Sequence, residues 1–82
     1  MKSMTEEEAM QWLAGVFAEK REKLRPETLR DNVPSWDSIG VITLMAELDE
    51  KCGIVLEEKD LQSMKCIGDI LAVLRKHGKL QG

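Results

Sequence analysis

Residues 37–52 read DSIGVITLMAELDEKC, and the fold prediction starts from this segment. Its apolar residues recur at intervals of three and four, the spacing that places side chains on one face of an α-helix. The stripe that should face the core consists of Val41, Leu44, Met45, Leu48 and Cys52. Ser35 or Asp37 can cap the free amides at the start, and Gly53 is suited to end the helix. The segment therefore predicts a helix that opens at residues 35–38 and runs to about Lys51.

A first helix is predicted near the start of the chain. Thr5 and Glu8 stand at the spacing of a capping box, in which each side chain bonds the other residue's backbone amide. Acidic residues follow Thr5 directly, and negative charge in the first turn suits the helix dipole. The buried face should consist of Ala9, Trp12, Leu13, Val16 and Phe17. We expect this helix to end around Glu19 or Lys20.

Two further helices are predicted in the last third of the chain. A short third helix is favoured at Glu57–Leu61, after an apolar stretch at 54–56 that should form a buried loop. The last helix is expected from Ile67 to about Lys76, where basic residues suit the C-terminal dipole and Gly78 provides the stop. Its inner face should be formed by Ile67, Ile70, Leu71 and Leu74.

Residues 20–36 break the helical pattern. Charged residues cluster at the start of this segment, and Pro26 and Pro34 disfavour helix in the residue before each of them. The segment therefore predicts a long first loop, fixed to the core by Leu24, Leu29 and Val33. A loop of this length in a compact domain is uncommon and often functional.

The overall composition agrees with an all-α fold. The chain has 82 residues, of which 43% are hydrophobic and 33% charged, and its one Phe and two Trp imply a mostly aliphatic core. This length is enough for one domain, to which we assign residues 1–82. The expected architecture is an all-α four-helix bundle with three main helices, a short third helix and a long first loop.

The net charge of −3 is unevenly distributed along the chain. Residues 37–60 hold seven acids against two bases, whereas residues 61–82 hold one acid against four bases. The acidic middle disfavours nucleic acid, whose phosphates need a basic face, and with it a helix-turn-helix DNA-binding domain. It favours a partner with a basic docking surface.

The sequence offers few catalytic or metal-binding groups. His77 is the one imidazole and lies in the last turn of the final predicted helix, while Cys52 and Cys66 fit no metal-binding spacing and have no activating neighbour. We therefore expect no enzymatic activity of the chain itself, and reduced thiols. No apolar run approaches the roughly 18 residues of a membrane span, and the start lacks the apolar core of a signal peptide. We expect a cytoplasmic monomer.

Ser38 is the remaining candidate for chemistry. A serine after an aspartate usually marks a plain helix start, but this one follows a long loop and opens an aliphatic, acidic helix. The arrangement resembles the acyl carrier protein family, the phosphopantetheine-binding carrier domains, whose attachment serine lies in an Asp-Ser-Leu motif. Asp37, Ser38 and Ile39 match that motif, and the resemblance covers essentially the whole chain, best from Pro34 to Leu74.

The resemblance implies a carrier that is the substrate of partner enzymes. Ser38 would accept 4'-phosphopantetheine from coenzyme A through a phosphopantetheinyl transferase, and the arm would carry acyl or aminoacyl groups as thioesters. Asp37 and Ile39 would flank the attachment point, where free amides at the helix start favour a phosphodiester. Gly40 would leave space beside the arm, and Trp36 would either pack near it or anchor the loop in the core.

Partner enzymes would dock beside the attachment point. Ile39 and Ile42 fall away from the inward stripe and should be exposed, ringed by the acids Asp37, Glu47 and Glu50. The partners implied are the transferase and an acyl- or aminoacyl-activating ligase or synthase with a basic docking patch. The alternative for Ile42 is partial burial of its side chain against the third helix.

The sequence departs from the fatty-acid-synthesis members of the family at three points. Gly40 and Thr43 stand where those members carry acids, and Trp36 replaces their Gly-Ala context before the motif. These differences point to a stand-alone carrier for an adenylating ligase or for a secondary-metabolite or cell-envelope pathway. Two alternatives stay open, namely a peptidyl or D-alanine carrier, and an unmodified helical adaptor in which Ser38 only begins a helix.

Overall fold

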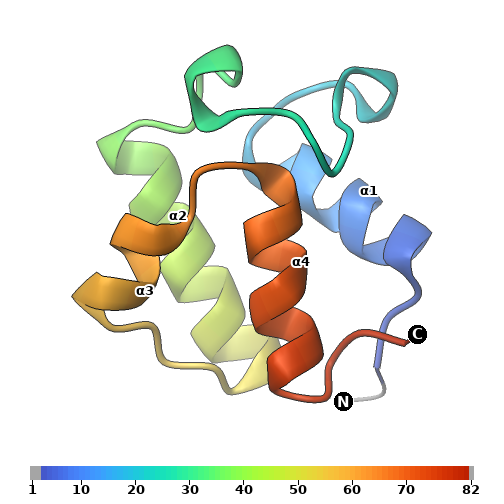
Figure 1. Ribbon diagram of the computed structural model, residues 1–82, viewed down its shortest axis with the longest axis vertical. Coiled ribbons are helices and arrows are strands. Elements are labelled where there is room, and N and C mark those ends of the chain that lie inside the picture. Colours follow the sequence, from blue (N-terminus) through green and yellow to red (C-terminus); the bar gives the residue numbers. More distant parts are fainter. Residues whose placement is uncertain (1–2, 82) are drawn as a thin grey trace.

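The computed structural model describes residues 3–81 and contains four α-helices, with no β-strand among these residues. The helices are α1 (Glu6–Val16), α2 (Ser38–Glu47), α3 (Glu58–Ser63) and α4 (Ile67–Lys76) (Figure 1). The prediction of an all-α fold with three main helices and a short third one is confirmed. No helix in the described part of the chain combines the length and the apolar character that crossing a membrane requires.

Helix α1 begins as its sequence predicts and ends earlier. The Glu8 amide donates to the Thr5 hydroxyl at 3.1 Å and the Thr5 amide donates to the Glu8 carboxylate at 2.9 Å, which completes the capping box. Ala18 then takes the left-handed conformation with φ of 51°, and the next amide, that of Glu19, bonds back to the Ala14 carbonyl at 2.8 Å. This turn ends the helix at Val16, about one turn before the predicted end at residues 19–20. The predicted end was too late because the left-handed residue that stops a helix is usually glycine, and here it is an alanine.

Helix α2 and its extension cover the predicted range. After Glu47 the helix continues as a wider π-helical turn, η3 (Leu48–Cys52), and Gly53 at φ 65° stops it in the left-handed conformation. Of the predicted inward stripe, Leu44, Leu48 and Cys52 are buried, while Val41 and Met45 lie half-buried at the edge of the core.

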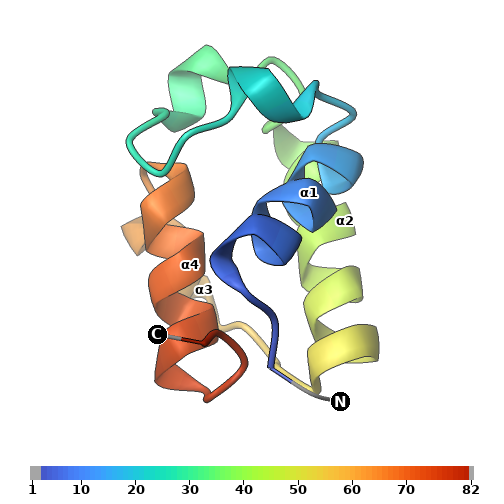
Figure 2. The ribbon, with the colours of Figure 1, turned by 90° about the vertical axis from the view of Figure 1, so that its right-hand side faces the viewer.

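The long loop between α1 and α2 crosses one end of the helices and contains two short 3-10 turns, η1 (Arg21–Lys23) and η2 (Arg30–Asn32) (Figure 2). Leu24 and Val33 are buried, as predicted. The prediction that Leu29 also anchors the loop is wrong, because its side chain is 53% exposed. The loop is held there by its backbone instead, through bonds to the connection between α3 and α4.

Three of these backbone bonds attach the loop to the start of α4. The Arg30 amide donates to the Lys65 carbonyl at 2.8 Å, the Ile67 amide to Thr28 at 3.0 Å, and the Gly68 amide to Pro26 at 2.7 Å. The two residues of each bond lie at least 35 positions apart in sequence, so side-chain periodicity carries no signal of these bonds. The bonds fix η2 beside the connection that follows α3.

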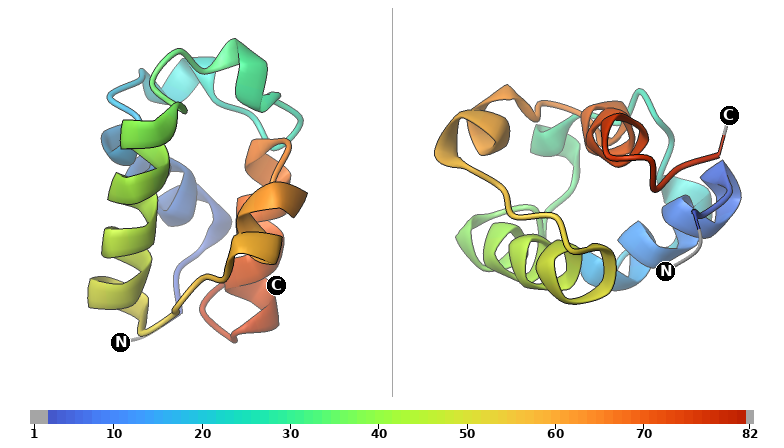
Figure 3. Two further views of the ribbon diagram at one scale, coloured as in Figure 1. Left: turned by 90° about the vertical axis from the view of Figure 1, so that its left-hand side faces the viewer. Right: turned by 90° about the horizontal axis from the view of Figure 1, so that it is seen from below.

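The core lies between α1, α2 and α4, which surround it on three sides (Figure 3). Its largest fully buried side chains are Met10, Leu13, Phe17, Leu24, Leu44, Leu48, Ile54, Ile67, Ile70 and Leu74. Helix α4 has the predicted bounds and inner face. In the stretch before α3, Ile54 and Leu56 are buried as predicted, but Val55 is 75% exposed, so only part of that segment is a buried loop. The core is aliphatic except for Phe17 and Trp36, as the composition indicated.

Candidate functional site

Ser38 is the first residue of α2 and is exposed, so its hydroxyl is accessible from outside the protein. Asp37 caps the helix: one oxygen of its carboxylate accepts hydrogen bonds from the Ile39 and Gly40 amides, both at 3.1 Å. These two amides are therefore occupied, and the expectation that the helix start offers free amides to a phosphodiester is wrong for them. The Asp37 carboxylate fixes the turn that presents Ser38.

Gly40 is required by the close approach of the loop that precedes α2. A Cβ atom at this position would overlap the carbonyl oxygen of Ser35, and that oxygen belongs to the backbone. Gly40 is also buried. The glycine thus has a structural role, because it lets residues 35–37 fold tightly onto the first turn; the space that it would leave beside an arm stays a prediction.

Trp36 anchors the residue before the motif in the core. Its side chain is 4% exposed, and its ring stacks on Phe17 with ring centres 5.0 Å apart and planes inclined by 23°. The guanidinium carbon of Arg30 lies 5.9 Å from the Trp36 ring centre, within the range of a cation–π contact. Two roles were considered for Trp36, packing near the arm and anchoring the loop in the core, and the structure shows the second. Trp36 thereby fixes the position of Asp37 and Ser38.

The two isoleucines of the predicted docking surface are exposed, Ile39 by 75% and Ile42 by 65%. The alternative in which Ile42 is half-buried against α3 is wrong. Of the acids expected around them, Asp37 and Glu50 are exposed, while Glu47 is half-buried and lies 3.5 Å from the Lys51 ammonium. The Lys51 ammonium therefore partly compensates the negative charge that Glu47 was expected to add to this surface.

Two further residues extend this surface beyond the prediction. Val55 and Asp49 line a hollow of about 350 Å³ together with Ile42, Met45, Ala46 and Leu56. Asp49 follows Ile42 by seven residues, close to two helical turns, and this spacing was a signal that could have placed it on the same face. Val55 gave no such signal, because an isolated valine in an apolar stretch usually lies in the core.

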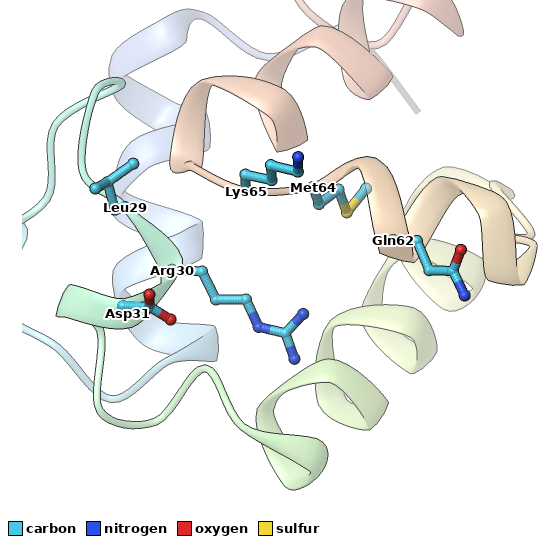
Figure 4. A pocket seen from close by; sticks show the side chains of 6 residues that line it. All are labelled: Leu29, Arg30, Asp31, Gln62, Met64 and Lys65. Carbon is cyan, nitrogen blue, oxygen red and sulfur yellow. The ribbon is translucent and has the colours of Figure 1, made fainter.

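Arg30 is a residue near Ser38 that sequence reasoning missed. Its Nε donates to the Trp36 carbonyl at 3.4 Å, two residues before Ser38. Arg30 also lines a hollow of about 310 Å³ with Leu29, Asp31, Gln62, Met64 and Lys65 (Figure 4). The sequence placed Arg30 in an irregular loop, and only the fold brings it to the start of α2.

The cysteines and the histidine line neither of the hollows described above. Both thiols are free, Cys52 buried and Cys66 half-buried, and burial raises the pKa of the Cys52 thiol. His77 is exposed at the end of α4. Among the described residues, no three His, Cys, Asp or Glu side chains gather in an arrangement that holds a metal ion.

Comparison with known proteins identifies no relative. No family model matches the chain, and no curated protein or solved structure matches it at a significant level. The residues themselves therefore carry the functional argument. What this site offers is an accessible primary alcohol on a rigid helix start, an apolar and acidic surface along the same helix, and an arginine beside the preceding turn.

Proposed function

We propose that this protein is a carrier domain of the acyl carrier protein type, with Ser38 as the attachment point of a phosphopantetheine arm. The observation that carries the proposal is an exposed serine at the first position of the second helix, directly after its capping aspartate. The order of a long loop, a second helix, a short third helix and a last helix supports the same assignment.

The residues around Ser38 fit such an arm. The hydroxyl is exposed, and the backbone that presents it is held by the Asp37 cap and the buried Trp36 ring. In the loading step, the Ser38 oxygen loses its proton and forms an ester bond to the phosphorus of the pantetheine phosphate, while the adenosine bisphosphate part of coenzyme A leaves. Ser38 has no base of its own in this proposal, because the transferase supplies the proton acceptor.

The arm, once attached, supplies a thiol that holds acyl or aminoacyl groups as thioesters. The domain's own contribution is to present this thiol to successive enzymes. A small rigid body suits that task, because the capped start of α2 fixes the origin of the arm while the arm itself moves.

The surface of α2 supports docking to partner enzymes. Exposed Ile39, Ile42 and Val55 provide apolar contacts, and Asp49, which lines the same hollow as Ile42 and Val55, adds negative charge. Glu50 is a further exposed acid of the same helical segment. Complementary charge mainly raises the rate of encounter, and a small apolar contact keeps the affinity modest. Both properties suit a carrier that must leave each enzyme after its reaction.

The same surface also supports the alternative of an unmodified adaptor, in which α2 binds one partner and Ser38 only begins the helix. The two proposals differ in a single property, the ability of Ser38 to accept an arm. The choice between acyl and aminoacyl or D-alanyl cargo is a further question, which the identity of the ligase that charges the arm decides.

Loading by a transferase separates the carrier from the adaptor. Incubation with coenzyme A and a phosphopantetheinyl transferase of broad specificity should increase the intact mass by one arm, and Ser38→Ala should abolish the increase. Ser35→Ala is the matched control, because it removes a hydroxyl three residues earlier and should still load. No mass increase with several transferases, or an equal increase in Ser38→Ala, contradicts the proposal.

A further inference from the structure

Two hollows lie on opposite sides of the turn that carries Ser38. The hollow on the α1 side, about 340 Å³, is lined by Asp37 and Ile39 together with Val16, Phe17 and Thr43. The hollow on the α3 side, about 310 Å³, reaches the turn through Arg30, whose Nε donates to the Trp36 carbonyl. An arm on Ser38 could enter either one, and the charges that line them differ.

A phosphodiester on Ser38 would carry a permanent negative charge, which attracts cationic side chains that lie close to the helix start. The Ile39 and Gly40 amides are already bonded to the Asp37 carboxylate. The same carboxylate lines the hollow on the α1 side and would repel a second anion placed there. No basic side chain lines the hollow on the α1 side, so a cationic partner for the phosphodiester is available only from the hollow on the α3 side among these two.

The hollow on the α3 side offers two cationic side chains. Arg30 and Lys65 line it, and the bond from the Arg30 amide to the Lys65 carbonyl at 2.8 Å holds their backbones together. Asp31 is the one acid in the lining, so the balance of formal charge is positive. Figure 4 shows the Arg30 side chain extending from η2 into this space, while the Asp31 carboxylate stays close to η2.

The guanidinium of Arg30 is partly fixed before any ligand arrives. Its contact with the Trp36 ring and its Nε bond to the Trp36 carbonyl both orient it toward the turn before Ser38. Within the part of the chain that the structure describes, these contacts leave the two terminal nitrogens of the guanidinium to bond other acceptors. Such paired donors match two phosphate oxygens, which is the geometry that favours arginine over lysine at phosphates.

We propose that Arg30, with Lys65 as a second cation, binds the phosphodiester attached to Ser38 and directs the arm into the hollow between η2 and α3. This inference rests on the proposed function. It assigns to the first loop a role in placing the arm, and it places the arm on the side of Ser38 away from α1.

The test uses NMR on protein loaded by the transferase, with loading first verified by mass. The Nε–H signal of Arg30 should shift between the unloaded and the loaded protein, and the shift should be absent in Ser38→Ala. In loaded Arg30→Gln, the phosphorus signal of the arm should move from its wild-type position. Arg25→Gln is the matched control, an exposed arginine of the same loop that lines neither hollow, and it should leave the phosphorus signal in place.

The possible failures point to different errors. Absence of the mass increase overturns the proposed function, and this inference with it. Normal loading with an unchanged Arg30 signal, and with shifts of the Val16 and Thr43 amides instead, places the arm on the α1 side and overturns this inference alone. An equal movement of the phosphorus signal in Arg25→Gln also overturns it, because the effect would then be one of general charge.

Discussion

Replacement of Gly40 by alanine should destabilise the protein, although alanine is the better helix former. In a solvent-exposed helix interior the change would stabilise by about 1 kcal/mol. Here the new Cβ would overlap the Ser35 carbonyl oxygen, so the backbone of residues 35–37 must shift. Forcing extra volume into a packed site costs about 1–3 kcal/mol. The atom that the new Cβ would meet belongs to the backbone and cannot rotate away, so we expect a cost toward the upper end of that range. The expected net loss is about 1–2 kcal/mol of unfolding free energy.

Gly15→Ala is the matched control for helix propensity. Gly15 lies in the last turn of α1, is exposed, and has no atom within 4 Å of the position that a Cβ would take. Alanine there should stabilise by about 0.5–1 kcal/mol. The two glycine replacements are thus expected to change the stability in opposite directions.

Urea unfolding followed by circular dichroism measures both variants. In a domain of this size, 1 kcal/mol corresponds to about 4–8 °C in Tm, so thermal unfolding gives a second readout. The transferase should also load Gly40→Ala more slowly than wild type, because the displaced turn carries Ser38. If Gly40→Ala were as stable as wild type or more stable, residues 35–37 could not lie against the first turn of α2.

Three further experiments test the helix cap, the docking surface and the burial of Cys52. Asp37→Ala removes the cap of α2 and should lower the unfolding free energy by about 1 kcal/mol in urea, whereas Asp37→Asn should keep most of it; equal losses would contradict the capping role. Ile42→Glu should leave stability within about 0.5 kcal/mol, because the side chain is exposed, but raise the transferase KM several-fold, and an unchanged KM would remove Ile42 from the docking surface. Alkylation should modify Cys66 faster than Cys52, because burial shields Cys52 and raises its thiol pKa, which lowers the reactive thiolate fraction at neutral pH. The rate at Cys52 should keep rising above the pH at which an ordinary thiol levels off, and equal rates in the folded protein would contradict its burial.

The parts of the fold that could be predicted from the sequence are those fixed by neighbours along the chain. The capping box of Thr5 and Glu8 and the bounds of α4 depend on residues a few positions apart, and both agree with the structure. The exposure of Ile39 and Ile42 followed from helical periodicity alone. Each of these features needs only local geometry, which the sequence displays directly.

The parts that could not be predicted depend on contacts between distant segments. Leu29 was expected in the core because it is apolar, but backbone bonds from this loop to the start of α4 hold the loop without it. Position 40 requires glycine because a Cβ atom there would overlap the Ser35 carbonyl oxygen, and no pattern of residue types reveals this overlap. Arg30 reaches the residue before the α2 cap only through the path of the folded loop, so no pattern along the chain could place it near Ser38.

Peptide mapping by mass spectrometry tests directly whether Ser38 carries the arm. Protein loaded with coenzyme A and a transferase is digested, and the fragments are searched for the added mass of one phosphopantetheine. We expect a single modified site, at Ser38, at no more than one arm per chain. An arm on a different serine, or a chain that several transferases leave unmodified, would contradict the assignment of Ser38.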